Sequence, residues 1–411
     1  MTFFILKQEY NLNRKKFALL QVQVNTIPMK IILHLFLLIL SLSSCTNHTS
    51  QNLQPFDEKS SWFFSDFQKV DSINPILTPS SSIKFTCPVM NEDVNWEERN
   101  VLNPSAVVKD GKVYLLYRAQ DKGGTSRIGV AVSNDGLHFE KMPEPVFYPD
   151  NDSMKVYEWN KRKGDDFVYK ADCKSCYFDG VEDPRIIESE EGLYVMTYTA
   201  YDGETARMSL ATSKDLLSWK KYGPILSDEK HKNTWSKSGA IVVEQTEDKI
   251  VAKKINGKYW MYFGDTNLFM ATSEDLIHWN ILENEENGNM ISVLHSRPGY
   301  FDSRLVEPGP FALYGEGGIN LIYNASNAAN LNDAEIPKFT YAAGQALFQK
   351  DKPYKLIDRT DSYFIHPDKD YEKTGEVNEV CFVEGLVHFQ GKWFLYYGTA
   401  DSRIAVAVNI Y

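Results

Sequence analysis

The sequence has no long basic run and carries an excess of acidic residues. Of its 411 residues, 44 are Lys or Arg and 55 are Asp or Glu, which gives a formal net charge of −11. Such a chain is a poor partner for phosphate backbones or anionic membrane surfaces, so we expect no nucleic-acid binding. Disorder and fibrous structure are also excluded, because 43% of the residues are hydrophobic and can form a substantial core.

Cysteine and histidine are scarce. The chain has 5 cysteines and 8 histidines. Cys173 and Cys176 have the spacing of a metal or redox pair, but no second pair of this kind occurs, and no histidine falls at ligand spacing beside them. A disulfide or plain thiols is therefore the preferred interpretation of this pair. We predict no metal site and no cofactor.

Long hydrophobic runs are absent as well. The apolar run from Ile31 to Leu40 is too short to span a bilayer as a mature helix. It follows Met29-Lys30 and precedes the tetrapeptide LSSC, which resembles a bacterial lipobox whose cysteine, Cys45, becomes the lipid-bearing N-terminus. A basic start, an apolar run and a small-residue cleavage site are typical of a signal peptide. The alternative is a buried apolar segment with an incidental cysteine.

These features predict four parts of the chain. Residues 1–28 are an over-extended start, since Met29 suits the pattern as the true start. Residues 29–45 are a lipoprotein signal peptide, residues 46–77 are a polar tether, and residues 78–411 are the folded domain. We therefore expect a protein of the Gram-negative cell envelope, anchored to the outer membrane through lipid on Cys45. Its exposure to the periplasm or to the medium stays open.

One phrase recurs five times. A glycine is followed six residues later by an aromatic residue that closes an apolar run, at Gly111–Tyr117, Gly192–Tyr198, Gly257–Phe263, Gly317–Tyr323 and Gly391–Tyr397. Each copy predicts a turn and a strand buried on both faces. The copies begin 81, 65, 60 and 74 residues apart. Repeats of this length that are rich in short strands favour the blades of an all-β, five-bladed β-propeller. A β-sandwich is the alternative, although it does not require five equivalent strands.

Polar residues interrupt this pattern just past the repeated aromatics. They are Arg118, Asp265, Asn324 and, slightly further on, Asp401. Two further phrases, GVEDPRI and LVEPGP, place Asp183, Arg185 and Glu307 between apolar and turn residues. Ligands of a propeller bind at the axis, where the innermost strands converge, so these residues are candidates for a site. Each one alone is equally well explained as a turn cap or a surface ion pair.

An ordered set of motifs resembles glycoside hydrolase family 130. The motifs are NP at Asn103, YRA at Tyr117, SRIGVAVSNDGLHFE at Ser126, EDPRI at Glu182, KSGAI at Lys237, YFGD at Tyr262, AAGQALF at Ala342 and YYGTADSRIAVAV at Tyr396. They cover the whole domain from about Pro75. The resemblance implies a five-bladed propeller that cleaves β-mannosides with inversion, either by phosphorolysis or, in one branch, by hydrolysis of β-1,2-mannosidic linkages.

The resemblance also implies roles for individual residues. Asp183 matches the family's catalytic acid, while Asn103, Arg118 and Asp401 match positions that line the mannose pocket. Arg185 is expected to orient Asp183 or a substrate oxygen, with a structural ion pair as the alternative.

Departures from the phosphorylase pattern favour water over phosphate. The Tyr-His pair of phosphorylases is Tyr323-Asn324 here, so the positively charged donor is absent. Glu307 stands where the phosphorylases have small residues. A carboxylate at this position repels phosphate and is suited to activating water. The hydrolase branch resembles this chain in carrying a second carboxylate, here Asp265 in place of the expected Glu. We predict Glu307 as the principal base and Asp265 as its helper.

The predicted function is thus an inverting β-mannoside hydrolase acting on mannose-containing oligosaccharides. Lys237 and Arg304 are possible anion ligands, which keeps open a phosphorylase that uses inorganic phosphate and releases mannose 1-phosphate. A non-catalytic glycan-binding lipoprotein is a further alternative.

Overall fold

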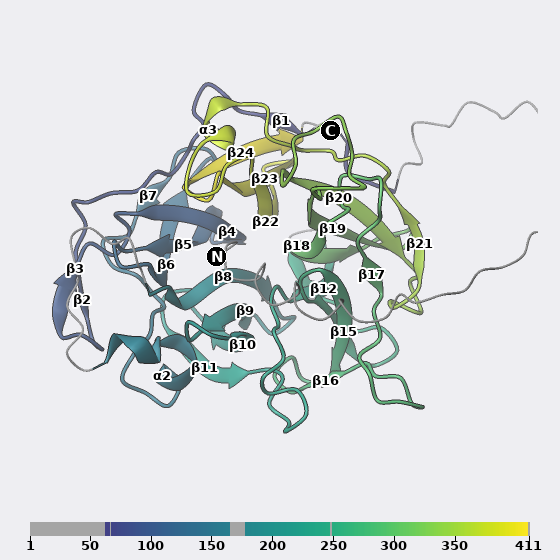
Figure 1. Cartoon of the computed structure of the whole chain (residues 1–411), viewed down its shortest axis with the longest axis horizontal. Helices are drawn as coiled ribbons and strands as arrows, with labels where there is room; N and C mark the ends of the chain where they lie inside the picture. The colour runs from purple at the N-terminus through teal and green to yellow at the C-terminus, as the bar shows by residue number, and fades with distance from the viewer. Residues whose placement is uncertain (1–61, 66, 165–176, 247–248, 410–411) are drawn as a thin grey trace, which may run out of the picture. The chain divides into compact units, whose positions relative to one another are not determined.

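Five antiparallel sheets make up most of the chain that the computed structural model describes, residues 62–65, 67–164, 177–246 and 249–409. All of these residues belong to one unit, Lys59–Tyr411. Each sheet has four strands, and the first strands of the sheets, β4, β8, β12, β18 and β22, lie around a common centre (Figure 1). We call the sheets blades 1 to 5 in chain order.

The blades have the following bounds. Blade 1 contains β4 (Asn100–Lys109), β5 (Lys112–Gln120), β6 (Thr125–Ser133) and β7 (Glu140–Lys141). Blade 2 contains β8 (Asp179–Glu188), β9 (Tyr194–Tyr201), β10 (Ala206–Ser213) and β11 (Trp219–Pro224). Blade 3 contains β12 (Ala240–Gln245), β14 (Tyr259–Phe263), β15 (Asn267–Ser273) and β16 (Trp279–Ile281). Blade 4 contains β18 (Leu305–Tyr314), β19 (Ile319–Ser326), β20 (Tyr341–Phe348) and β21 (Leu356–Arg359). Blade 5 contains β22 (Cys381–Phe389), β23 (Lys392–Thr399), β24 (Arg403–Asn409) and β1 (Gln68–Lys69). The shorter elements are β2 (Phe85–Cys87), β3 (Glu92–Val94), β13 (Ile250–Ala252), β17 (Leu294–His295), α2 (Lys155–Glu158), a 3-10 helix (Lys161–Lys163) and α3 (Asp370–Lys373).

The repeated phrase of the sequence forms the second strand of every blade. These strands, β5, β9, β14, β19 and β23, are buried over most or all of their length. The fold is therefore mostly β and agrees with the predicted five-bladed propeller. The predicted signal peptide, Cys45 and the Cys173–Cys176 pair lie outside the described residues.

The aromatic residue that closes the phrase has a second role in four of the blades. Its hydroxyl donates to a buried carboxylate at an O–O distance of 2.9 Å, and a basic side chain pairs with the same carboxylate. The sets are Tyr117–Glu97–Lys141, Tyr198–Glu158–Lys221, Tyr323–Asp302–Arg359 and Tyr397–Glu372–Lys69. A buried charge is tolerated only when it is paired and hydrogen-bonded, so each set fixes the outer parts of its blade to the second strand. Blade 3 has Phe263 at this position and lacks the hydroxyl.

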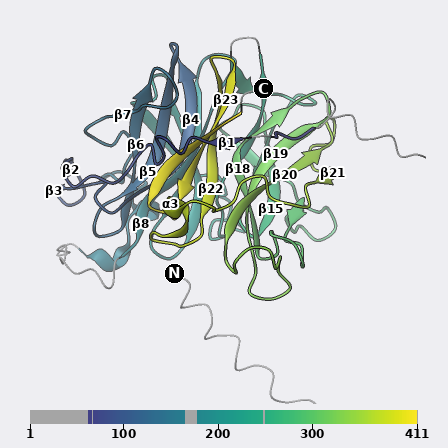
Figure 2. The same cartoon turned by 90° about the horizontal axis from the view of Figure 1, so that it is seen from above.

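The domain begins earlier than the sequence indicated. β1 falls inside the predicted tether 46–77, yet Gln68 pairs with Val408 and completes blade 5 (Figure 2). Leu77, also within the predicted tether, is buried and pairs with Ile404. The tether prediction is wrong for these residues because a two-residue strand has no periodicity to detect. Its partner also lies at the other end of the chain.

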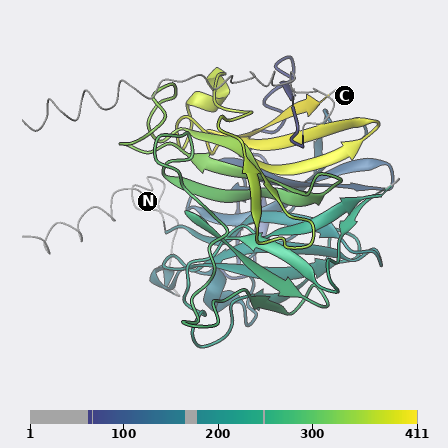
Figure 3. The same ribbon diagram turned by 90° about the vertical axis from the view of Figure 1, so that its right-hand side faces the viewer.

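Short parallel pairings join neighbouring blades. β6 meets β8 at Thr125 and Asp179, and β12 meets β18 between Val242–Glu244 and Ala312–Tyr314. Blades 4 and 5 also lie side by side, as the green and yellow strands of Figure 3 show.

Over the described residues, Cys87 and Cys381 are buried free thiols, and no helix is long and apolar enough to cross a membrane.

Candidate active site

Bulges in the innermost strands bring polar side chains together at the axis. The register shifts around Asn103 in β4, around Asp183 in β8 and around Glu384 in β22. Asn103 and Asp183 have φ angles of 48° and 50°, a left-handed conformation that Asn and Asp tolerate better than most residues. Such bulges re-aim a side chain out of the regular alternation of a strand. The bulges therefore direct these polar side chains differently from the side chains of the neighbouring residues in each strand.

Asp183 is held by two side chains of blade 1. Its Oδ1 accepts from Asn103 Nδ2 at 2.9 Å and from Arg118 Nη1 at 3.1 Å. Burial disfavours its charge, but the cations Arg118, Lys237 and Arg185 outweigh burial and lower the pKa of Asp183 to about 2. In the unliganded protein Asp183 is therefore a carboxylate at neutral pH.

Glu307 lies in the opposite electrostatic situation. Its carboxylate accepts from the Ser238 hydroxyl, and its side chain is buried. Burial raises the pKa of Glu307 to about 7; Lys237 opposes this rise and Asp265 adds to it. The two predicted catalytic carboxyls therefore differ widely in proton affinity, which acid–base chemistry requires.

Arg185 connects the acidic residues to the backbone of β18. Its Nε donates to Gly309 O at 2.8 Å and its Nη2 to Pro308 O at 2.8 Å. The same Nη2 lies 4.0 Å from Glu307 Oε1 and 3.0 Å from Glu384 Oε1. Arg185 therefore holds the bulged segment that carries Glu307.

Glu384 is a site residue that the sequence reasoning missed. It is buried to 1% exposure, and burial raises its pKa well above the usual value, with Arg185 opposing this rise. A signal for it existed, because Val-Glu occurs in the first strand of four blades, at Val181-Glu182, Val243-Glu244, Val306-Glu307 and Val383-Glu384. All of these glutamates except Glu244 are buried.

Lys237 and Arg118 supply positive charge to this acidic site. Arg118 Nη2 lies 2.6 Å from Glu182 Oε1. Burial lowers the pKa of Lys237, but carboxylates, chiefly Glu307 and Asp183, raise it overall. Both cations are therefore charged and stabilise the carboxylates around them.

Asp401 and Asp265 lie at the edge of the site and are partly exposed. Burial of its carboxyl raises the pKa of Asp401 to about 6, with Arg118 opposing the rise. Asp265 accepts from Trp235 Nε1 at 2.8 Å and from the Thr266 hydroxyl at 3.2 Å.

Two predicted site residues, Asn324 and Arg304, have contacts within the protein. Asn324 Nδ2 donates to Val383 O at 2.9 Å, and its Oδ1 accepts from Val383 N at 2.7 Å. The Asn324 amide thus ties blade 4 to blade 5, and its contact with a sugar stays a prediction. Arg304 donates to the Ser326 hydroxyl at 3.3 Å and lies over the Phe339 ring at 5.3 Å.

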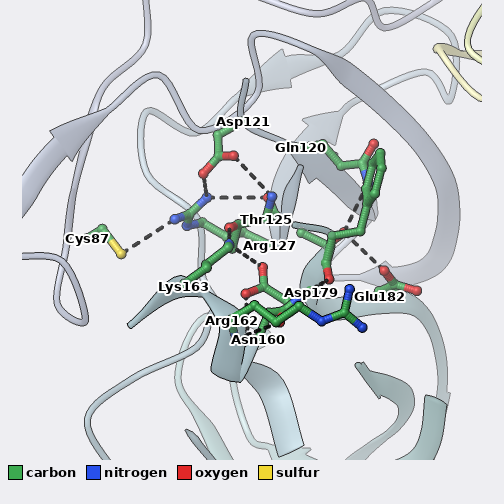
Figure 4. Close-up of polar contacts among 12 residues, drawn as sticks. Cys87, Gln120, Asp121, Thr125, Arg127, Asn160, Arg162, Lys163, Asp179 and Glu182 are labelled. Carbon is green, nitrogen blue, oxygen red and sulfur yellow. Dashed lines mark hydrogen bonds and ion pairs between the residues drawn. The ribbon is translucent and has the colours of Figure 1, made fainter. Parts of the chain in front are cut away.

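A buried polar network supports the Arg118–Glu182 side of the site (Figure 4). Lys163 Nζ lies 2.8 Å from Asp179 Oδ1, with both side chains fully buried, and Arg127 pairs with Asp121 at 2.6 Å. The network joins the segment after α2 to blades 1 and 2. It fixes the strands from which the site residues project.

A cavity of about 60 Å³ lies near the other end of the innermost strands, lined by residues that include Ile187, Lys249, Phe311 and His388. None of the predicted site residues lines it. Over the described part of the chain, no group of three or more His, Cys, Asp or Glu side chains is placed to hold a metal ion.

Several buried carboxylates at a propeller axis, paired with cations and differing in proton affinity, are the constellation of an enzyme that cleaves glycosidic bonds. The family model described as beta-1,4-mannooligosaccharide phosphorylase matches residues 69–410. The chain belongs to glycoside hydrolase family 130 and is a carbohydrate-active enzyme, either a hydrolase or a phosphorylase.

Solved structures and characterised relatives support this assignment. A glycosyl hydrolase from Bacteroides ovatus is 42% identical and has a TM-score of 0.78, covering 84% of this chain and 94% of that one. A second solved structure belongs to a description of the GH130 family as containing glycoside hydrolases that target beta-1,2 mannosidic linkages in Candida mannan. It is also 42% identical, with a TM-score of 0.79, and the match covers 85% of this chain and 94% of that one. A 1,2-beta-oligomannan phosphorylase from Thermoanaerobacter sp. (strain X514) is 28% identical over 82% of this chain and 95% of its own length.

Proposed function

We propose that this protein is an inverting glycoside hydrolase acting on β-mannosides, with β-1,2-linked manno-oligosaccharides as its substrates. The observation that carries the proposal is Glu307, a buried carboxyl with a pKa of about 7 beside Lys237 and Arg185. A general base works best when its pKa lies near the working pH. The likeness to structures described as glycoside hydrolases supports the same conclusion.

In this mechanism Asp183 gives a proton to the glycosidic oxygen and Glu307 activates the attacking water. Inversion follows because the water attacks the sugar from the face opposite the leaving group. Asn103 and Arg118, which already contact Asp183, are placed to hold the mannose hydroxyls beside it. Asp265 raises the pKa of Glu307 and so helps the base accept a proton.

The mechanism requires one proton on the Asp183–Glu307 pair. Between pH about 2 and about 7 the unliganded pair holds one proton, and it resides on Glu307. The mechanism therefore requires that substrate binding move this proton from Glu307 to Asp183 and leave Glu307 ionised.

A second carboxyl group near Glu307 favours water over phosphate as the nucleophile. Asp265 is close enough to raise the pKa of Glu307, so a phosphate dianion at this place meets two carboxyl groups. Water carries no charge, so these carboxyl groups do not repel it, and Glu307 can accept its proton.

The test is product analysis with β-1,2-mannobiose, with and without inorganic phosphate. We expect free mannose at the same rate in both, released first as the α-anomer, which proton NMR resolves. Production of mannose 1-phosphate that depends on added phosphate contradicts hydrolysis and establishes a phosphorylase. That second candidate is favoured by Lys237 and Arg304, two cations at or near the site.

A glycan-binding protein without activity is separated from both enzymes by Asp183→Asn. We expect this variant to lose turnover and keep mannobiose binding, measured by calorimetry. A wild-type protein that binds mannobiose and never cleaves it supports the binding protein.

We propose further that lipid on Cys45 anchors the mature protein in the bacterial envelope. The LSSC tetrapeptide supports this proposal. Cell fractionation of Cys45→Ala tests it: the variant should leave the membrane fraction, and continued membrane association contradicts the anchor.

A further inference from the structure

Trp235 is an exposed aromatic side chain with a fixed orientation. Its side chain lies just before β12, and 42% of the residue is exposed. The indole Nε1–H donates to Asp265 Oδ2 at 2.8 Å, and the ring packs edge-on against Tyr201, with centroids 6.2 Å apart and an angle of 68° between planes. Two independent contacts therefore hold a large apolar surface that remains open to solvent.

This ring lies at the edge of the candidate active site. The ammonium of Lys237, two residues further on, is 5.7 Å from the Trp235 ring centroid. The charges of Glu307, Asp183 and Asp265 all act on the same ammonium. The Lys237 ammonium therefore interacts both with the Trp235 ring and with the two proposed catalytic carboxyls.

The two oxygens of Asp265 are occupied by neighbours. Oδ2 accepts from Trp235, and Oδ1 accepts from the Thr266 hydroxyl at 3.2 Å. Thr266 has a φ of 71°, so the backbone turns sharply directly after Asp265. Asp265 is thereby placed to fix the angle of the indole as well as to influence Glu307.

We propose that Trp235 is a stacking platform for the second sugar ring of the substrate, next to the mannose held in the pocket, and that Asp265 is its positioning residue. A pyranose has an apolar face of C–H groups, and an aromatic ring with a free face is the side chain that packs against it. An indole held in advance loses little conformational freedom when the sugar binds. This subsite rests on the proposed function, because it assumes a substrate of at least two sugar rings.

The test is a comparison of two ligands in the non-hydrolysing Glu307→Gln protein. Calorimetry without phosphate measures the affinities of mannose and β-1,2-mannobiose. Trp235→Ala should weaken mannobiose binding about tenfold and change mannose affinity by less than about twofold. Trp235→Phe, which keeps a ring, should recover part of the loss. Asp265→Ala should show the same ligand preference with a smaller loss.

The matched control is Tyr222→Ala. Tyr222 is 39% exposed and has the Lys220 ammonium 4.6 Å from its ring, but it lies on the outer strand β11. We expect no change in either affinity. Fluorescence gives a second measurement: mannobiose, and not mannose, should alter the emission of the protein, and Trp235→Phe should remove this difference.

Equal losses for both ligands show that Trp235 merely supports the pocket and overturn the subsite. Unchanged mannobiose binding in Trp235→Ala overturns it as well. Failure of the proposed function is distinguishable, because phosphate-dependent turnover contradicts hydrolysis while the binding result still stands. A wild-type protein that binds no mannoside contradicts both.

Discussion

Replacing Glu307 by glutamine should abolish activity and stabilise the fold above neutral pH. The pKa of this carboxyl rises from its usual 4.5 to about 7 in the folded protein. Between these values the folded protein keeps a proton that the unfolded chain releases, so wild-type stability falls as the pH rises from 4.5 to 7. At 1.36 kcal/mol for each pH unit, the loss is about 3 kcal/mol above pH 7.

Glutamine is neutral at every pH and avoids this loss. It also keeps an oxygen that can accept from the Ser238 hydroxyl. Thermal unfolding of the wild type and Glu307→Gln at pH 4 and pH 8 therefore gives the measurement. The variant should gain up to about 3 kcal/mol over the wild type on going from pH 4 to pH 8. Any effect of the amide that does not depend on pH cancels in this comparison.

Two controls sharpen the result. Glu316→Gln is the matched control, because it makes the same substitution at an exposed position. Asp183→Asn should have the opposite sign and cost about 2 kcal/mol at both pH values, because the folded pKa of Asp183 is lowered from 3.8 to about 2 and its stabilisation is present above pH 3.8. A Glu307→Gln protein whose stability relative to wild type is the same at pH 4 and pH 8 refutes the reasoning.

Three further predictions concern activity and packing. The kcat/KM for mannobiose should be level below pH about 7 and fall about tenfold per pH unit above it. The reason is that the Asp183–Glu307 pair loses its one proton above pH about 7. A rise of kcat/KM above pH 7 in a pH–rate profile contradicts this proton count. Tyr323→Phe should destabilise the protein by about 1–3 kcal/mol in thermal unfolding, since Asp302 loses a buried donor, and unchanged stability would mean that this hydroxyl is dispensable. Asn324→Leu should lower the unfolding temperature, because Val383 loses both of its backbone partners on the Asn324 amide, and a raised KM of the folded variant would confirm the predicted sugar contact.

The polar residues of the site show where sequence reasoning reached its limit. Asp183 and Glu307 were predicted because turn-forming and apolar neighbours surround a carboxylate, which is visible in one short segment. Glu384 has the same Val-Glu signature but was missed, since its importance comes from Arg185 of another blade. Asn324 follows a repeated aromatic like Arg118 does, yet its amide contacts the backbone of the next blade. Sequence position alone does not distinguish these cases.

The sequence by itself determined the number of blades, because each blade repeats one local phrase whose burial pattern is set by its own residues. It also determined the family and the candidate carboxylates, since their motifs are contiguous. Only the tertiary structure decided that β1 completes blade 5, because a two-residue strand is specified by its distant partner. It alone set the proton affinities of Asp183 and Glu307, because these depend on burial and on cations supplied by separate blades.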